Sequence, residues 1–301
     1  MSEWKPDICL YHFPCDDGFA SAWTVQNKWP DCAMVPINYG QKFPDIDLTG
    51  KRLLIADFSF PPNALADFAN KAKEIVILDH HKTAKADLVE FEVGICGDAL
   101  FAAADIDGMF RDMAELGRPA ILARFDMERS GASLTWEFCF PHLPTPVFVQ
   151  IIEDRDLWRF KLRETRAFSL YLRSFPYDFA KWSEIAGRLR DDPNLVMGEA
   201  LSIERFYDQK LAEMLPTATL KTIGKWPGVP VAHAPYAFAS DLANELLKAH
   251  PQAPFAAVVV DAYGGRTYSL RSENSRQDVS EVAKTFGGGG HRNAAGFRVP
   301  L

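Results

Sequence analysis

Aspartate and histidine side chains recur in this 301-residue sequence at the ends of short apolar runs. Carboxylate and imidazole groups without thiolate suit Mn²⁺, Mg²⁺, Fe²⁺ or Zn²⁺. Seven such groups are too many for one ion, and a carboxylate can bridge two ions. Two ions about 3.5–4 Å apart can hold both the attacking and the leaving oxygen of a phosphoryl transfer. The runs "ICLY", "RLLIA" and "IVIL" are followed by His12, Asp16, Asp17, Asp57, Asp79, His80 and His81.

The apolar runs alternate with helical patterns, which predicts an α/β fold: a parallel sheet with helices on both faces. The carboxyl ends of neighbouring parallel strands share one edge of the sheet, so the seven side chains are expected to meet there. Each has an ordinary alternative: a lone Asp often caps a helix, and a lone His often lies in a core. Candidate ligands follow three separate strand ends, and a shared site explains this better than three coincidences do. Strands are expected at residues 7–13, 33–39, 52–59 and 75–81, and helices at 17–29, 61–74, 99–116 and 130–140.

The rest of the chain predicts a second, smaller α/β domain. We expect a catalytic domain over residues 1–194, a linker helix over 195–216 and the second domain over 217–301. Its expected strands lie at 229–234, 255–263 and 266–272, with a helix at 278–286. No motif can be placed within residues 96–126.

A glycine run, "FGGGGHRNAAGF", follows this last helix. It is no dinucleotide fingerprint, because no strand precedes it, and it lacks the Lys-Ser/Thr of a P-loop. Glycines permit positive φ and close approach of the backbone to a ligand. His291, Arg292 and Asn293 supply donors, "NAAG" is expected to begin a helix, and Arg271 at a strand end is a second candidate for binding phosphate.

Composition narrows the function classes. The net charge is −7, with +3 on residues 217–301 and −10 on the rest, which disfavours binding to long nucleic acid. The sequence shows neither a membrane span nor a signal peptide, and its five cysteines form no CxxC pair, so we expect a cytoplasmic protein without disulfides. The sequence does not decide whether the chain forms a homodimer.

"ILDHH", about 200 residues ahead of "GGGGHRNAAGF", resembles the DHH phosphoesterase family, specifically members with the DHH-associated C-terminal domain. The resemblance covers most of the chain. It implies a metal-dependent phosphohydrolase, typically with two Mn²⁺ ions, although Mg²⁺ or another divalent ion also fits. Members include exonucleases, degraders of very short RNA (nanoRNA), cyclic-dinucleotide phosphodiesterases, nucleoside bisphosphate phosphatases and some pyrophosphatases.

The resemblance also implies roles for individual residues. Asp57 would bridge the ions, and His81 would face the scissile phosphate, so these two are the expected catalytic residues. Within "IIEDRDLW", the resemblance implies that Asp154 is the last metal ligand. Without the resemblance, this cluster would be interpreted as charged surface residues. The implied metal ligands are His12, Asp16, Asp17, Asp57, Asp79, His80 and Asp154, and the implied substrate-binding residues are Arg271, Gly289, Gly290, His291 and Arg292.

One departure concerns the first motif, which many members write H-x-x-x-D-x-D. Here "HFPCDDG" places Asp16 and Asp17 side by side, with Cys15 where a carboxylate could align. Adjacent residues on an extended segment point apart. Either one metal site is weakened, or another ligand such as Cys15 replaces Asp16.

The expected reaction is hydrolysis of short oligonucleotides or linear dinucleotides to mononucleotides by metal-activated water. The alternatives are a nucleoside 3′,5′-bisphosphate phosphatase and a non-catalytic regulatory protein that binds metal or nucleotide. The expected partner is this short substrate, with neither long nucleic acid nor membrane.

Overall fold

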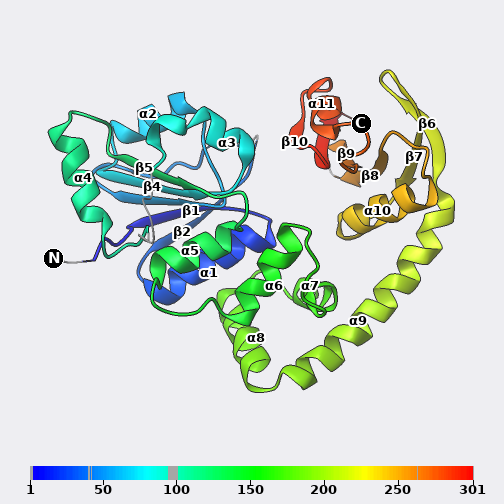
Figure 1. The fold of residues 1–301 in the computed structure, drawn as a ribbon, viewed down its shortest axis with the longest axis horizontal. Helices are drawn as coiled ribbons and strands as arrows, with labels where there is room; N and C mark the ends of the chain where they lie inside the picture. The colour runs from blue at the N-terminus through cyan, green and yellow to red at the C-terminus, as the bar shows by residue number, and fades with distance from the viewer. Residues whose placement is uncertain (1–2, 40, 42, 94–100, 263, 301) are drawn as a thin grey trace. The chain divides into compact units, whose positions relative to one another are not determined.

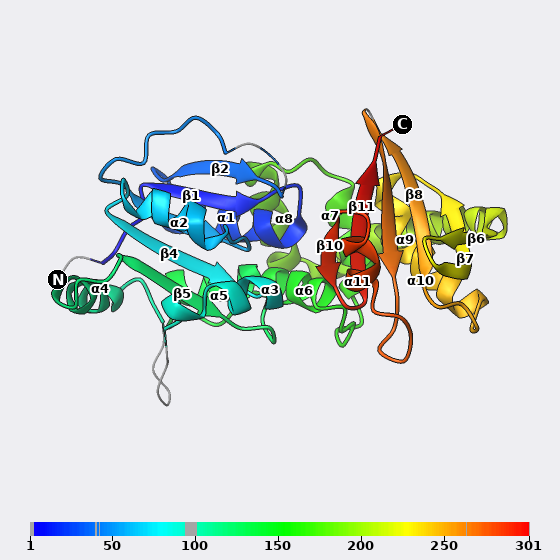
Figure 2. The same cartoon turned by 90° about the horizontal axis from the view of Figure 1, so that it is seen from above.

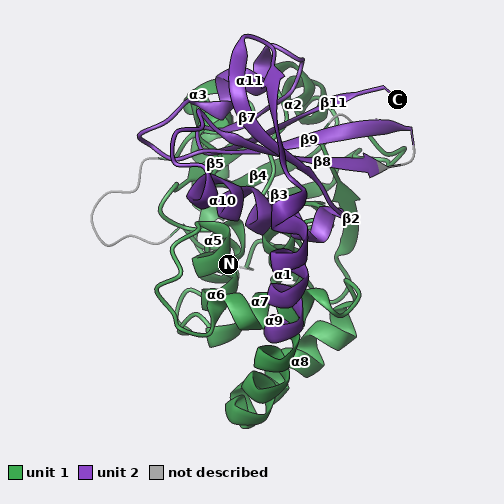
Figure 3. Cartoon of the chain, turned by 90° about the vertical axis from the view of Figure 1, so that its right-hand side faces the viewer, with its two compact units in different colours: residues 1–203 green, residues 204–301 purple. Residues whose placement is uncertain are grey.

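The chain forms two compact units in a computed structural model, which describes residues 3–39, 41, 43–93, 101–262 and 264–300 (Figure 1). The first unit comprises residues 1–203 and the second residues 204–301 (Figure 3). The division falls within the long helix α9 (Pro193–Met214), which contains most of the expected linker segment. Each unit contains its own sheet. The separate tasks expected of the domains stay predictions.

The sheet of the first unit has five parallel strands in the order β2-β1-β3-β4-β5 (Figure 2). From β1 the chain continues to β2, which pairs with one side of β1, and then to β3, which pairs with the other side of β1. Such a switch point opens a crevice at the carboxyl ends of the two strands, where ligands bind in open α/β sheets. The strands are β1 (Ile8–His12), β2 (Ala33–Ile37), β3 (Arg52–Ala56), β4 (Glu74–Asp79) and β5 (Ile121–Phe125).

Helices cover both faces of this sheet, because alternate strand residues point to opposite faces. Leu54 and Val76 pack with apolar residues of α1 and α5, whereas Leu53 and Ile75 pack with those of α2. Figure 1 shows α1 and α5 on one face of the sheet and α2 on the other. Burying one such side chain contributes about 1.5–3 kcal/mol. The expected α/β class is thus confirmed. The helices of this unit are α1 (Asp16–Lys28), α2 (Pro62–Ala69), α3 (Lys82–Asp87), α4 (Ile106–Glu115), α5 (Gly131–Cys139), α6 (Val147–Asp156), α7 (Thr165–Arg173) and α8 (Phe179–Asp191).

The segment that carried no motif builds part of this fold. It contains α4 and the edge strand β5, and Phe110 of α4 stacks on Trp4 with ring centroids 6.4 Å apart. Of the expected helix over residues 99–116, positions 99 and 100 lie outside the described residues, and the rest is helical only in α4, which follows a turn at residues 103–105. Cys96 also lies outside them.

The second unit is a six-stranded mixed sheet in the order β10-β11-β9-β8-β7-β6. Only β7 and β8 pair in parallel among its described strands. The expectation that "NAAG" begins a helix is wrong, because Ala295 and Phe297 are buried on alternate positions of a strand. The elements are β6 (Thr219–Ile223), β7 (Trp226–His233), α10 (Ala239–Ala249), β8 (Ala256–Ala262), β9 (Gly265–Arg271), α11 (Val279–Lys284), β10 (Gly289–His291) and β11 (Ala294–Val299).

Short 3-10 helices occupy Val89–Phe91, Leu215–Thr217 and Tyr236–Phe238. Within the described ranges, none of the helices combines the length and the apolar character that crossing a lipid bilayer requires.

Candidate metal centre

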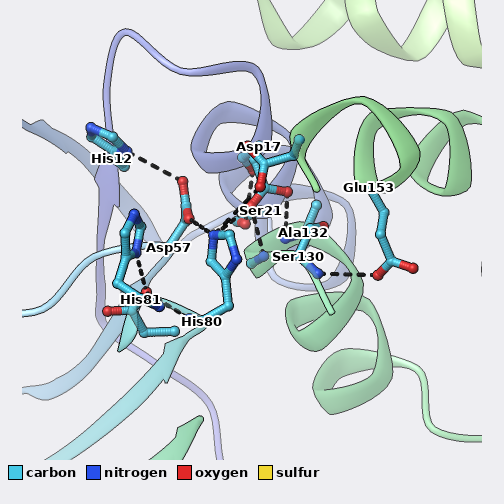
Figure 4. Close-up of polar contacts among 12 residues, drawn as sticks. His12, Asp17, Ser21, Asp57, His80, His81, Ser130, Ala132 and Glu153 are labelled. Atoms are coloured by element: carbon cyan, nitrogen blue, oxygen red, sulfur yellow. Dashed lines mark hydrogen bonds and ion pairs between the residues drawn. The ribbon is translucent and has the colours of Figure 1, made fainter. Parts of the chain in front are cut away.

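Three neighbouring strand ends of the first unit bring the predicted side chains together (Figure 4). Strand β1 ends at His12, Asp57 follows the last residue of β3, and β4 ends at Asp79. Because β3 lies between β1 and β4, these residues share one edge of the sheet. The predicted meeting of strand ends is therefore present in the fold.

The side chains at this edge form two groups of potential metal ligands. His12, Cys15 and Asp57 make the first group, and Asp17, His80 and Asp156 make the second. In each group the candidate donor atoms lie within 4.8 Å of one another. A further grouping of Asp57 and His80 with Asp79 and His81 connects the two. The arrangement is compatible with divalent metal binding, while the identity of the metal stays a prediction.

Asp57 belongs to the first group and also contacts the second through His80. Its Oδ1 is 3.0 Å from Nε2 of His80, and its Oδ2 is 3.4 Å from Nδ1 of His12. The residue has φ of 54°, a conformation that is uncommon outside glycine and is often held in place at functional sites. Burial by itself raises the pKa of Asp57, but its close contacts with the imidazoles of His12 and His80 outweigh burial and hold this pKa below its usual value. Asp57 therefore stays ionised and directs one oxygen toward each group.

Two buried atoms of the first group lack the hydrogen bonds that buried polar atoms normally make. Nδ1 of His12 and Oδ2 of Asp57 lie 3.4 Å apart as an ion pair, and neither makes a hydrogen bond among the described residues. A divalent cation between them would satisfy both atoms, and nitrogen and carboxylate oxygen are donors that such ions accept. The residues present thus fit a metal ion.

Asp17 of the second group is held by the first turn of α5. The backbone N–H of Gly131 donates to its Oδ2 over 2.6 Å, and that of Ala132 donates to its Oδ1 over 3.0 Å. The helix begins there because Ser130 caps it through the N–H of Ser133. Burial, together with the charges of Asp57 and Asp156, raises the pKa of Asp17. A bound cation would offset this accumulation of negative charge.

Two glycines allow α5 to lie close to Asp57 and α1 to lie close to His12. A Cβ on Gly131 would lie 2.5 Å from Cβ of Asp57, and a Cβ on Gly18 would lie 2.1 Å from the carbonyl oxygen of His12. Real side chains essentially never come so near. The bare backbone at these positions is thus a condition for the geometry of the centre.

Both carboxylate oxygens of Asp79 accept hydrogen bonds from residues that follow β3 and β4. Oδ2 accepts from the hydroxyl of Ser59 over 2.5 Å, and Oδ1 accepts from the N–H groups of His80 and His81. Oδ1 also lies 2.6 Å from Nδ1 of His81. This contact orients the imidazole ring, as carboxylates behind functional histidines do. The ligand role expected of Asp79 and the catalytic role expected of His81 stay predictions.

At the end of α6, the structure places the expected ligand Asp154 and its neighbour Asp156 in different surroundings. Asp154 is 5% exposed and belongs to neither ligand group. Its carboxylate accepts from the N–H groups of Lys161 and Leu162 and from the hydroxyl of Thr165, so it ties the following loop to the helix. Asp156 instead lies 3.6 Å from Nε2 of His80. The aspartate near His80 is therefore the second one in "EDRD".

In the first motif, the adjacent residues Asp16 and Asp17 likewise have different surroundings. Asp16 belongs to neither ligand group. Its Oδ2 accepts from Nε of Arg173 over 2.6 Å, and its Oδ1 accepts from the hydroxyl of Tyr177 over 2.8 Å. Asp17, the next residue, faces the centre. The structure thus places Cys15, rather than the predicted ligand Asp16, beside His12 and Asp57.

Tyr39 is a neighbour of the centre that sequence reasoning missed. Its ring centroid lies 5.5 Å from that of His12 and 4.3 Å from that of Phe58, and the residue is 53% exposed. No local pattern marks it, because it lies just after β2 in sequence and reaches His12 only through the pairing of β2 with β1.

The predicted substrate residues lie in the second unit. His291 pairs with Ala294, which in turn pairs with Arg271, so these residues form one row across β10, β11 and β9. The Arg271 guanidinium donates to the hydroxyl of Ser240 over 2.5 Å. The Arg292 guanidinium donates to the carbonyl oxygen of Asn274 over 3.0 Å. Their roles toward a substrate stay predictions.

Three of the four glycines in the run have a structural reason. Gly287 and Gly290 have φ of 75° and 138°, and a Cβ on Gly288 would lie 2.1 Å from the carbonyl oxygen of Gly296. Gly289 has neither a positive φ nor an atom within 4 Å of an added Cβ. The run is therefore needed largely to let α11 turn into β10 against β11.

Comparison with known proteins gives two relatives in sequence. The uncharacterized protein R106 of Acanthamoeba polyphaga mimivirus is 31% identical over 310 residues, covering 97% of this chain and 67% of the viral protein. The oligoribonuclease NrnB of Bacillus subtilis strain 168 is 25% identical over 246 residues, covering 78% of this chain. The chain spans 55% of the length of the oligoribonuclease. No family model matches the sequence.

Solved structures resemble the chain more weakly. The pGpG-specific phosphodiesterase PggH from Vibrio cholerae is 10% identical, with a TM-score of 0.49 over 98% of this chain and 94% of that one. A likeness at this level does not bear on function.

Proposed function

This chain belongs to one family with the viral protein R106, and we propose that it is a metal-dependent phosphoesterase of the DHH type. Its substrates are short oligonucleotides or linear dinucleotides, which it cleaves to mononucleotides. The motif pattern and the similarity to an oligoribonuclease support this assignment.

The observation that carries the proposal is that Asp57 contacts both groups of ligands. One oxygen of Asp57 faces His80 and the other faces His12, as a bridging carboxylate requires. Two divalent ions bound there, Mn²⁺ in the first place, would polarise the phosphoryl group and supply a nucleophilic water near neutral pH. His12 with Cys15 would hold one ion, and Asp17, His80 and Asp156 would hold the other.

Other residues of the chain act on the phosphate and on the site itself. His81, oriented by Asp79 over 2.6 Å, donates a hydrogen bond to a phosphoryl oxygen as negative charge builds there. Gly131 and Ala132 keep Asp17 in place through their backbone N–H groups. Asp79 thus positions a residue that faces the phosphate, and α5 positions a residue that would hold an ion.

The second unit supplies groups for the substrate beyond the reacting phosphate. Residues 217–301 carry a net charge of +3, in contrast to −10 on the rest of the chain. Arg271 and His291 lie in one row of the sheet, which suits a second phosphate. Gly289 and Gly290 belong to β10, and Arg292 directly follows it. This limited basic surface favours a short anionic substrate over long nucleic acid.

The test is product release from a substrate panel with added Mn²⁺. The panel holds pApA, pGpG, a five-nucleotide RNA, a cyclic dinucleotide, a nucleoside 3′,5′-bisphosphate and pyrophosphate. Cleavage of the linear dinucleotides or of the RNA, abolished by Asp57→Ala, supports the proposal. Cleavage of the bisphosphate alone would assign a phosphatase instead. Silence of the metal-loaded protein toward the whole panel would leave a regulatory protein that binds metal or nucleotide.

A further inference from the structure

We propose that Cys15 is a direct metal ligand, which makes the half of the centre formed with His12 and Asp57 selective for a thiophilic divalent ion. This inference rests on the proposed function, since it concerns one of the two ions assigned there. It separates the two halves chemically: one offers nitrogen, sulfur and oxygen, and the other offers nitrogen and oxygen alone.

The position of the sulfur supports a bond to metal. Cys15 lies directly before α1 with extended backbone, at φ of −149° and ψ of 137°. Its Sγ, a ring nitrogen of His12 and a carboxylate oxygen of Asp57 lie within 4.8 Å of one another. Donors that share one tetrahedral ion at bond lengths of about 2.0–2.3 Å lie roughly 3–4 Å apart. Small side-chain rotations therefore suffice to complete the site.

A second, independent observation points to a ligand at the same place. The Asp57 side chain is 2% exposed, and its Oδ2 has no hydrogen-bond partner among the described residues. Nδ1 of His12 is likewise buried without a hydrogen-bond partner. Both atoms belong to residues of the group that contains Cys15. An ion held by all three residues explains why these atoms remain without hydrogen bonds.

The alternative oxygen donor of the first motif is engaged elsewhere. Arg173 and Tyr177 hold both oxygens of Asp16, at 2.6 and 2.8 Å. The described cysteines other than Cys15 belong to no group of potential ligands, and Cys9, Cys32 and Cys139 are all buried. Cys15 is thus the described thiol that the fold delivers to the centre.

The donor set determines which ion each half prefers. Thiolate favours Zn²⁺ and similar ions, whereas carboxylate and water favour Mg²⁺ and Mn²⁺. As the sulfur–metal bond forms, the thiol loses its proton to solvent. We therefore expect the half with Cys15 to prefer Zn²⁺ or Co²⁺ over the Mn²⁺ named above for both ions, whereas the half with Asp17, His80 and Asp156 accepts Mn²⁺.

The test is titration of the metal-free full-length protein with Co²⁺, followed by absorption spectroscopy. A bond between cobalt and Cys15 gives sulfur-to-cobalt charge-transfer absorption in the near ultraviolet. We expect Cys15→Ser to remove this absorption while Co²⁺ still binds. Cys32→Ser is the matched control: Cys32 is buried away from the centre, with its Sγ 3.9 Å from the carbonyl oxygen of Ala33, and its variant should retain the band.

Two further measurements use other readouts. Bound Zn²⁺ should protect Cys15 of the unaltered protein from alkylation, as peptide mass spectrometry would detect. Cys15→Asp should lower the ratio of Zn²⁺ to Mn²⁺ affinity by at least about tenfold, the loss typical even of substitutions outside the ligand shell. Cobalt binding without the charge-transfer band, or alkylation unaffected by metal, would overturn the role of Cys15 alone. Absence of any metal binding would overturn the proposed function as well.

Discussion

Oδ2 of Asp17 accepts a 2.6 Å hydrogen bond from the backbone N–H of Gly131. The first turn of α5 thereby fixes a carboxylate on the first turn of α1. The positive end of a helix dipole favours a negative charge at this position. The same glycine lies against Asp57, so one residue positions a carboxylate in each ligand group.

Gly131→Ala should therefore disturb the centre. Its new Cβ would lie 2.5 Å from Cβ of Asp57, and relief of this overlap moves either α5 or Asp57. We expect a loss of about 1–3 kcal/mol in the free energy of unfolding and a fall of about 100-fold in activity. Urea denaturation and the hydrolysis assay measure the two effects.

Gly187→Ala is the control for this substitution. Gly187 lies inside α8 with open space around it, so alanine should raise the free energy of unfolding by about 0.5–1 kcal/mol. Unchanged activity and stability in Gly131→Ala would show that the approach of α5 to Asp57 is unimportant.

The two aspartates at the end of α6 should behave in opposite ways. Asp156→Asn should weaken metal binding with little change in stability, because its side chain is 27% exposed beside His80. Asp154→Asn should keep its metal and lose about 1–3 kcal/mol of stability, because a buried set of hydrogen bonds is weakened. Metal content and urea denaturation distinguish the pair. Loss of metal in Asp154→Asn but not in Asp156→Asn would contradict the arrangement.

The stabilising effect of Asp154 should depend on pH. Burial by itself raises the pKa of Asp154, but hydrogen bonds from Thr165, Lys161 and Leu162 outweigh burial and lower this pKa. A lowered folded pKa stabilises the protein fully above the unfolded pKa of about 4, and the effect is lost as pH falls through the folded pKa. The stability difference between the natural protein and Asp154→Asn should thus shrink from pH 7 to pH 2. A constant difference would contradict this account.

Metal binding should release protons. Burial by itself lowers the pKa of His80, but its hydrogen bond with Asp57 and the charges of Asp156 and Asp17 raise this pKa to about 11 in the metal-free chain. A histidine ligand must be neutral, so a metal ion has to displace this proton. The apparent affinity for Mn²⁺ should therefore rise with pH up to that value.

Calorimetry in two buffers of different ionisation enthalpy measures this release. We expect about one proton from His80 for each chain at pH 7. Asp154→Asn should release the same number, because its substitution lies outside both ligand groups. Equal heats in the two buffers would mean that His80 is already neutral or does not bind the metal.

Much of the centre could be predicted because it lies at strand ends. Continuous apolar runs such as Leu53–Ile55 mark strands buried on both faces, and parallel pairing then brings their ends together. The choice between Asp154 and Asp156 could not be made in this way. Residues two apart on a helix point about 200° apart, so the packing of α6 decides which one faces His80.

The second unit shows a different limit of sequence reasoning. The glycine run suggested a loop leading into a helix N-terminus that binds anions, yet residues 294–299 form a strand. The alternation of Ala295 and Phe297, both buried, was the local signal for that strand. Strand β6 was also not expected, because four of its five residues are exposed and no buried face marks it.

The sheet of the first unit also has a second edge, opposite the one that carries the candidate metal centre. The turns that enter the strands, such as residues 116–120 before β5, lie at the amino-terminal edge of the sheet, away from His12, Asp57 and Asp79. Residues 116–119 are exposed, and Gly117 turns the chain there with φ of 62°. A peptide tag or fluorescent label inserted at Gly117 would report on the protein while leaving the ligand geometry intact.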